Sequence, residues 1–207
     1  MHMEFSRQLI HLSGFLFIML AQFAGKLLTA FYFLMIALSF FIYSEYMKIE
    51  EKRLENFIKR FELKVRDFIT RFERKTIIRP FTGAIWFYLS CGLCFLVFPL
   101  HVASAAGATL AVGDALSTMI GLKFGKHKII GNKSVEGSLT LVITSFLVSL
   151  IFVNPYPAFF GSITAGTAEL VPEAKKLKTF KERGWLDDNL LIPLLTGLVI
   201  YVSTVIM

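Results

Sequence analysis

The sequence predicts an all-α, polytopic bundle of about seven transmembrane helices, and three observations lead to this fold class. Hydrophobic residues make up 55% of the 207 residues, a composition typical of membrane proteins rather than of water-soluble domains. Apolar runs that approach the ~20 residues of a membrane-spanning helix recur along the chain. The basic residues gather between particular runs, as the positive-inside rule requires of cytoplasmic segments.

Seven apolar windows define the expected helices. They cover residues 8–24, 27–47, 81–98, 102–122, 137–153, 157–171 and 190–206. The window at 157–171 is the weakest because it is short and rich in small residues, so a six-span bundle is the alternative. We expect one integral membrane domain over residues 1–207. Cys91 and Cys94 lie inside an apolar window and cannot complete a metal site alone, so we assign them to helix packing.

The basic residues orient the bundle. Residues 48–79, 123–133 and 175–183 hold eleven, four and five Lys or Arg. Seven spans with a cytoplasmic N-terminus place these segments and Arg7 on the cytoplasmic side, and only Lys26 falls outside. Within 48–79, apolar residues recur at three-and-four spacing, which predicts an amphipathic cytoplasmic helix on the inner membrane surface.

Ionisable residues in or beside the apolar windows share that cytoplasmic side. A charge at the bilayer centre costs at least about 2.5 kcal/mol, so such residues are candidates for function. Asp114, in TLAVGDALSTM, is the clearest, although it can also hydrogen-bond a neighbouring helix. The other candidates are Glu45, Glu136, Glu169, Asp187, Asp188 and Asn189. Acids hold Mg²⁺ and basic side chains hold phosphate, so this gathering favours a site for a magnesium nucleotide.

Lys133 begins a pattern that favours phosphate. It precedes Ser134, Glu136, Gly137 and Ser138 at the entry to a helix, where free backbone N–H groups attract anions. An ordinary N-cap explains the Ser and Glu equally well, and it is also the alternative for Asp187, Asp188 and Asn189.

A stripe of small residues leads toward Lys133. Gly121 and Gly125 belong to it, and it predicts either close helix packing or a close approach of a nucleotide to the backbone. The spacing is not that of a Walker A motif. Lys123, Lys126 and Lys128 can be topology signals alone.

The first helix carries a polar stripe. Glu4, Arg7, His11 and Gly14 fall on one face. This face can handle a phosphate or a hydroxyl group, or His11 can be structural.

Taken together, these motifs resemble the CTP-dependent lipid-alcohol kinases, the family of the dolichol, polyprenol, phytol and yeast-type diacylglycerol kinases. The resemblance follows the order of motifs along nearly the whole chain. The matching residues are Arg7 and His11; Arg79, Pro80 and Gly83; Gly113, Asp114, Gly121 and Gly125; Lys133, Ser134, Glu136, Gly137 and Ser138; and Glu169, Asp187, Asp188, Asn189 and Pro193. Gln8 stands where the family has a Lys, so the second positive charge of the opening pair is missing.

The resemblance implies transfer of the γ-phosphoryl group of CTP to the hydroxyl of a membrane lipid alcohol. The implied partners are CTP, the alcohol and membrane lipids, with no nucleic acid, and the short chain suggests a prokaryotic cell membrane. The implied catalytic residues are Asp114, His11, Arg7 and Glu136. The implied Mg²⁺ ligands are Asp114, Glu136, Glu169, Asp187 and Asp188. The implied nucleotide-binding residues are Gly113, Gly121, Gly125, Lys133, Ser134, Gly137, Ser138 and Asn189.

Two other functions fit parts of this pattern. A membrane cytidylyltransferase also uses CTP and Mg²⁺, but it joins a lipid phosphate to the α-phosphate and releases pyrophosphate. An ion-coupled transporter that uses Asp114 is the alternative of another class, although the chain has no internal repeat of the kind that such carriers usually show.

Overall fold

The computed structural model describes residues 2–49, 81–174, 177 and 187–206. Over these residues the chain is nearly all-α, with one two-stranded antiparallel sheet. The long elements are α1 (His2–Ala24), α2 (Lys26–Ile49), α4 (Thr82–Val97), α7 (Val135–Ser149), α8 (Pro155–Leu170) and α10 (Asp188–Ile206). A central rod joins α5 (Leu100–Ala108), the π-helix η2 (Thr109–Asp114) and α6 (Ala115–Phe124). The short elements are β1 (Lys128–Ile130), β2 (Lys133–Ser134) and the 3₁₀ turn η3 (Val171–Glu173).

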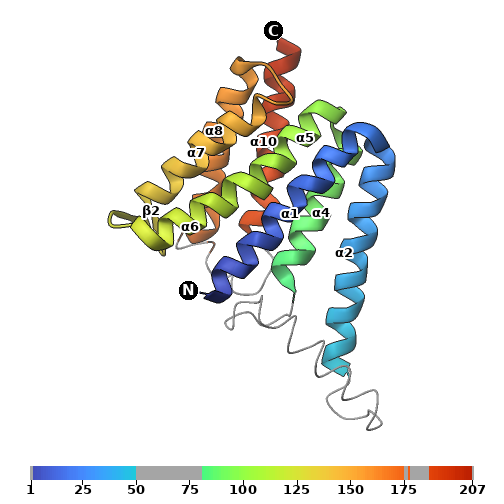
Figure 1. The fold of residues 1–207 in the computed structure, drawn as a ribbon, viewed down its shortest axis with the longest axis horizontal. Coiled ribbons are helices and arrows are strands. Elements are labelled where there is room, and N and C mark those ends of the chain that lie inside the picture. The colour runs from blue at the N-terminus through green and yellow to red at the C-terminus, as the bar shows by residue number, and fades with distance from the viewer. Residues whose placement is uncertain (1, 50–80, 175–176, 178–186, 207) are drawn as a thin grey trace.

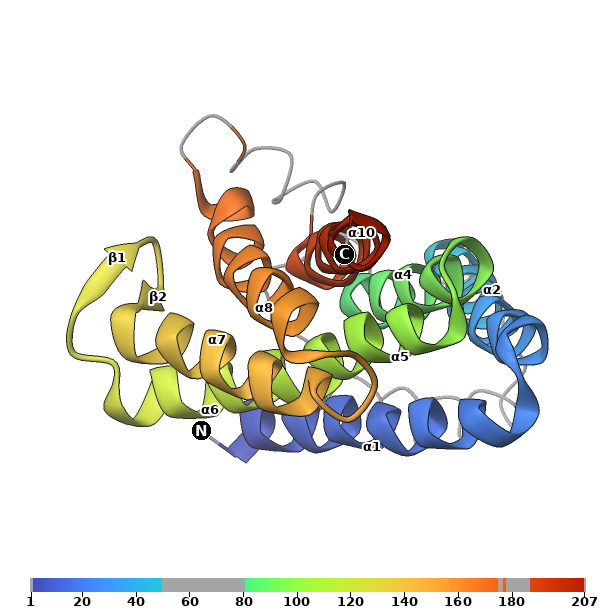
Figure 2. The same ribbon diagram turned by 90° about the horizontal axis from the view of Figure 1, so that it is seen from above.

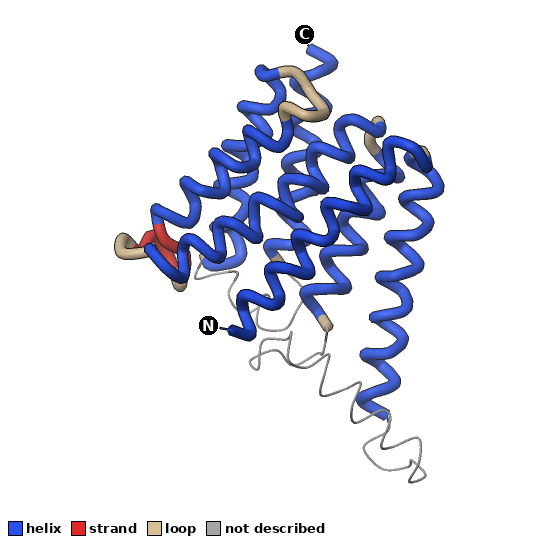
Figure 3. The backbone as a smooth tube through the Cα atoms, viewed as in Figure 1, coloured by secondary structure: helices blue, strands red, loops and turns tan. Residues whose placement is uncertain are grey.

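The helices run alternately up and down the bundle, and the two ends of the chain lie at opposite ends of it (Figure 1). The β1–β2 hairpin lies at the end where α1 begins, as the red strands in Figure 3 show. We call this the hairpin end. Lys26 lies at the other end, where its ammonium donates to the carbonyl of Phe98 between α4 and α5. Lys26, the one basic residue outside the segments predicted to be cytoplasmic, therefore lies at the opposite end of the bundle from the hairpin.

Each of the seven predicted windows coincides with a helix or, for 102–122, with the central rod. Three stretches are long and apolar enough to cross a membrane: Lys26–Tyr46, Leu100–Phe124 and Asp188–Ile206. Shorter apolar helices cover His11–Ala24, Thr82–Val97 and Val135–Ser149. The all-α membrane class is confirmed, while the count of seven spans and the cytoplasmic N-terminus stay predictions. The expected amphipathic helix at 48–79 lies outside the described residues, except for positions 48 and 49.

The outward surface of the bundle is apolar, as a lipid-facing surface must be. On α2, Leu27 is 67% exposed and Phe31 is 56% exposed, and on α10 Val205 is 67% exposed. The core combines large apolar side chains such as Phe95 and Leu110 with many small residues and buried hydroxyl groups, as is common between closely packed membrane helices. These features agree with helices that pack within a bilayer.

The central rod is the most enclosed part of the fold. In Figure 2 it runs between α1 and the pair α4 and α10, and every residue from 102 to 111 is buried. Gly107 faces Ile18 and Cys91 at this crossing. Cys91 and Cys94 are buried free thiols, so the prediction that they serve helix packing is confirmed.

Two local features were not predicted. The rod widens into a π-helix that ends at Asp114, and such turns are frequent at functional sites. The segment between α6 and α7 is a hairpin whose tip, Gly131, has a φ of 54°, a conformation that glycine adopts at little cost.

Candidate functional site

Lys133 is the centre of a charged cluster at the hairpin end. Its Nζ lies 2.9 Å from Glu169 Oε1, in the last turn of α8, and 3.1 Å from Asp188 Oδ2, in the first turn of α10. All three side chains are largely buried, with exposed fractions of 16%, 3% and 10%. The cluster joins the hairpin to two helix ends that are far apart in the sequence.

Two hydroxyl groups extend the cluster. Ser138, one turn into α7, donates to Glu169 Oε2 at 2.8 Å. Ser117 of α6 lies 3.4 Å from Glu169 Oε1 and 3.0 Å from the carbonyl of Asp114. Glu169 therefore accepts from residues on three elements, and its carboxylate is held in one orientation.

Asp114 belongs to the same charged region. It is 4% exposed, and its charge acts on Lys133. A π-turn holds more residues than an α-turn, so it rotates the helix face that follows. The π-helix therefore helps to determine which neighbours Asp114 and Ser117 face.

The electrostatics keep Lys133 charged. Burial alone lowers its pKa, but Asp188, Glu169 and Asp114 outweigh that effect and raise the pKa above the ordinary value for lysine. Lys133 is consequently a permanent ammonium group near neutral pH. It suits the neutralisation of phosphate charge and not the role of a general base.

The three consecutive residues Asp187, Asp188 and Asn189 make different contacts. Asp187 Oδ1 accepts from the backbone N–H of Asn189 at 2.9 Å, so it caps α10. Asp188 pairs with Lys133. The amide nitrogen of Asn189 lies 3.5 Å from the carbonyl of Gly83, and among the described residues its buried Oδ1 has no hydrogen-bond partner.

Glu136 does not join Lys133. Its carboxylate lies 2.7 Å from His127 Nδ1 and 3.3 Å from the backbone nitrogen of His127. Hydrogen bonds from its own backbone N–H and from the His127 ring lower the pKa of Glu136 to about 2. Its observed contacts fasten the base of the hairpin, so the sequence prediction of a catalytic, metal-binding Glu136 gains no support from the geometry.

The predicted nucleotide-binding glycines are packed against protein. A Cβ on Gly125 would meet Gly121 O and Ser134 Oγ, and one on Gly137 would lie 3.1 Å from Ser117 O. A Cβ on Gly113 would lie 2.7 Å from Ser145 Oγ. Ser134 caps α7 by accepting from Gly137 N–H at 3.2 Å. Close packing and capping, the alternatives in the sequence pattern, account for these residues.

The opening motif lies on α1. The His11 ring packs edge-on against Phe87 of α4, with ring centroids 4.9 Å apart, and Gln8 is fully buried. The described contacts of Lys133 are with Glu169 and Asp188 and include neither residue. The side chain of Arg7 lies outside the described part of the chain. The roles predicted for Arg7 and His11 therefore stay predictions.

The cluster suits a magnesium ion that arrives with its phosphates. Three carboxylates against one ammonium leave two formal negative charges, and oxygen is the ligand that Mg²⁺ prefers. Within the described residues no group of three or more His, Cys, Asp or Glu forms a ready-made metal site. Mg²⁺ commonly uses one or two carboxylates, waters and substrate phosphates, so one or two of Asp114, Glu169 and Asp188 can hold such an ion without forming a closed cage.

Sequence reasoning missed two residues of this region. Ser117 follows Asp114 by three positions, and this i, i+3 spacing on one helix was the available signal. His127 lies in a segment without helical periodicity, so its pairing with Glu136 depends on a hairpin that the sequence did not predict.

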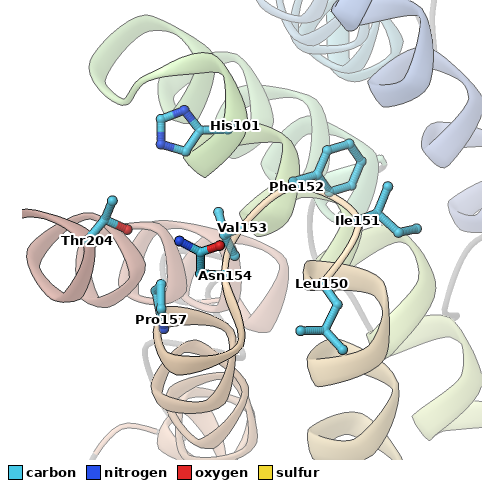
Figure 4. Close-up of a pocket in the computed structure, with 8 residues that line it drawn as sticks. All are labelled: His101, Leu150, Ile151, Phe152, Val153, Asn154, Pro157 and Thr204. Carbon is cyan, nitrogen blue, oxygen red and sulfur yellow. The ribbon is translucent and has the colours of Figure 1, made fainter. Parts of the chain in front are cut away.

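A cavity of about 340 Å³ opens at the other end of the bundle. Figure 4 shows His101, Asn154 and Thr204 around it, with Pro157 and residues 150–153 completing the lining. Its residues come from the start of α5, the α7–α8 turn and the last turns of α10. It is thus separate from the Lys133 cluster.

The fold and the cluster define a class: an all-α membrane protein with acids, hydroxyl groups and a charged lysine gathered at one end. The chain is 32% identical to phytol kinase of Synechocystis sp. over 131 residues, which are 59% of this chain and 54% of that protein. It is 33% identical to dolichol kinase of Saccharomyces cerevisiae over 86 residues, 41% of this chain and 16% of that protein. An uncharacterized protein of Rickettsia prowazekii is 24% identical over 193 residues, 92% of this chain and 90% of that protein.

These relatives confirm the resemblance to the lipid-alcohol kinases. The matched region spans about half the length of the phytol kinase and a smaller part of the dolichol kinase. No model of a known protein family matches the chain, and no solved structure matches it.

Proposed function

We propose that this protein transfers the γ-phosphoryl group of CTP to the hydroxyl of a membrane lipid alcohol of the polyprenol, dolichol or phytol type. The single observation that carries the proposal is the buried Lys133, held by Glu169 and Asp188 beside Asp114 and Ser138. The relatives named phytol kinase and dolichol kinase support the lipid-alcohol class. The choice of CTP rests on the resemblance of the motifs.

In this proposal Lys133 neutralises phosphate charge. Phosphoryl transfer is mostly positioning and electrostatic stabilisation, because charge spreads over the γ-phosphate oxygens in the transition state. The ammonium of Lys133 is already oriented by two carboxylates, so little reorganisation is needed when phosphate oxygens replace one of them.

Asp114 is the proposed base or metal ligand, and His11 is the alternative base. In the transfer step the lipid hydroxyl gives its proton to that base and its oxygen bonds to the γ-phosphorus. The bond from the γ-phosphorus to the bridging oxygen breaks, and CDP leaves with the electron pair. Mg²⁺ bound by one or two of the carboxylates of Asp114, Glu169 and Asp188 would supply further charge neutralisation. Ser117 and Ser138 orient Glu169.

The surroundings of the cluster suit a lipid substrate. The cluster lies at an end of an apolar bundle, where an amphiphilic alcohol can keep its chain in the bilayer and its hydroxyl near the charged groups. We propose that this end faces the cytoplasm, where the nucleotide is available, because the positive-inside pattern of the sequence favours that orientation.

The test is incubation of the purified, lipid-reconstituted protein with γ-labelled CTP or ATP, Mg²⁺ and a panel of polyprenol, dolichol, phytol and diacylglycerol. We expect label from CTP in a lipid monophosphate, a loss with Lys133→Met and little change with Lys26→Met. Label in no lipid would refute the kinase proposal, and label from ATP alone would reject CTP. Incorporation of α-labelled CTP into a lipid phosphate would instead identify a cytidylyltransferase.

A further inference from the structure

The hairpin end carries positive charge that the Lys133 cluster does not use. Three lysines of this end are exposed. Lys123 lies at the end of α6, Lys126 lies before β1 and Lys128 lies in β1. Lys133, in contrast, turns inward to Glu169 and Asp188. We call residues 122–130 the basic arm of the hairpin.

Large apolar side chains alternate with these lysines. Leu122 is 60% exposed, Phe124 is 51% exposed and Ile129 is 46% exposed. The Lys123 ammonium lies 5.2 Å from the centre of the Phe124 ring. A surface that is both strongly basic and apolar suits neither bulk water nor hydrocarbon, and it fits the boundary between them.

The basic arm is continuous with the lipid-facing surface. Val135 and Leu139, at the start of α7, are 47% and 56% exposed. Apolar surface thus reaches the hairpin, and the lysines follow directly beyond it. In an apolar helix bundle this is the level of the lipid headgroups.

The arm is held on a fixed frame. The backbone nitrogen of Val135 donates to the carbonyl of His127 at 2.8 Å, and the Glu136 carboxylate holds the His127 ring and backbone. Lys128 Nζ donates to the carbonyl of Asn132 at 3.2 Å. These contacts fix the base of the hairpin, so Lys128 is held in the hairpin, and Lys126 and Lys123 directly precede it.

We propose that the basic arm is a binding surface for the headgroups of anionic phospholipids. The lysines contact lipid phosphates, while Leu122, Phe124 and Ile129 enter the adjoining part of the bilayer. The occupant follows from charge complementarity and from the apolar side chains, because a soluble anion would leave those side chains in water. The inference needs only a membrane protein, so it stands or falls separately from the kinase activity.

The experiment uses the full-length protein in vesicles, with a fluorophore on Asn132→Cys at the tip of the hairpin. The native Cys91 and Cys94 are buried, so labelling is directed to the exposed position. Quenching is measured with brominated phosphatidylglycerol and with brominated phosphatidylcholine at equal mole fractions. The compared variants are the triple K123Q/K126Q/K128Q and, as a single loss of charge at the other end, Lys26→Gln.

We expect stronger quenching by the anionic lipid in the parent protein and in Lys26→Gln. A lysine near an anionic surface strengthens binding about fivefold, so the triple variant should need at least about tenfold more anionic lipid for half-maximal quenching. The basic residues of 48–79 are present in every variant, so the difference reports on the basic arm. Raising the salt from 0.05 to 0.5 M should weaken the preference in the parent protein without any mutation.

Equal quenching by the two brominated lipids in the parent protein would overturn the proposal. So would an unchanged lipid preference in the triple variant. If the triple variant lost affinity for CTP and kept its lipid preference, the lysines would serve the nucleotide and the proposal would be wrong.

Discussion

The ammonium of Lys133 lies 2.9 Å from the carboxylate of Glu169, although 36 positions separate the two residues. The contact ties the hairpin to the last turn of α8, and Asp188 adds the first turn of α10. Breaking a buried ion pair by removing one partner leaves an uncompensated charge, which is far more costly than losing an exposed pair.

Lys133→Met should therefore destabilise the protein and abolish transfer. The Glu169 and Asp188 carboxylates would lose their counter-ion, at a cost of about 3–5 kcal/mol. Phosphoryl transfer should fall at least about a hundredfold, because a donor aimed at developing charge is removed. Unfolding in mixed micelles and the labelled-CTP assay measure the two effects. Lys26→Met is the control, and full activity of Lys133→Met would refute the role of Lys133.

The effects of Ser138 and Glu169 substitutions on the free energy of unfolding should be coupled. Ser138→Ala removes a 2.8 Å hydrogen bond to a buried carboxylate, which should cost about 1.5–3 kcal/mol. In a Glu169→Gln background the same substitution should cost less, because the charged acceptor has gone. Ser162→Ala is the matched control, since its hydroxyl donates to Phe159 O within its own helix. Equal costs of Ser138→Ala in the two backgrounds would show that the bond is unimportant.

The variants Gly125→Ala and Gly121→Ala test whether these glycines serve close packing or nucleotide binding. A Cβ on Gly125 would collide with Gly121 O and lie 2.5 Å from Ser134 Oγ, whereas one on Gly121 would have its nearest contact at 3.4 Å. Overpacking should cost Gly125→Ala about 1–3 kcal/mol and leave Gly121→Ala nearly neutral. Thermal unfolding and CTP binding are measured for both. An equal loss of CTP affinity in the two variants, with stability unchanged, would support the nucleotide-binding role instead.

Glu136 should contribute stability that acid removes. Its pKa is lowered from 4.5 to about 2, so the folded state favours the carboxylate. The contribution is therefore complete above the ordinary pKa and is lost as the pH falls from about 4.5 through about 2. Glu136→Gln should be less stable than the parent protein at pH 7, and the difference should shrink over that acidic range. A difference that stays constant from pH 7 to pH 2 would contradict the pairing with His127.

The helices were predictable from the sequence because apolar length is a local property. The windows at 27–47 and 190–206 coincide with α2 and α10 since each helix must cover its backbone with apolar side chains. The hairpin and the π-helix were not predictable in the same way. TLAVGD contains no breaker that specifies a π-turn, and the turn depends on packing against α7, as between Thr109 and Ser149.

The charged cluster was predictable as a set of residues but not as a set of contacts. Burial of charge singled out Asp114, Glu169 and Asp188 because an ionisable group in an apolar segment is costly. Which acid pairs with Lys133, and which caps a helix, depends on how α8 and α10 return to the hairpin. Neighbouring acids such as Asp187 and Asp188 therefore differ in role although their sequence context is the same.

Asp114→Asn should distinguish the two roles that remain open for this residue. The change removes the charge and keeps the shape, and Lys133 retains Glu169 and Asp188, so we expect the fold to persist. If Asp114 is the base, transfer should fall at least about a hundredfold while Mn²⁺ binding, measured by electron paramagnetic resonance with CTP present, stays unchanged. If Asp114 is a metal ligand, Mn²⁺ affinity should fall together with transfer. Ser145→Ala is the matched control, because Ser145 is buried beside Gly113 on the same crossing. Retained transfer in Asp114→Asn would exclude both roles, and the buried carboxylate would then be a structural partner of Lys133.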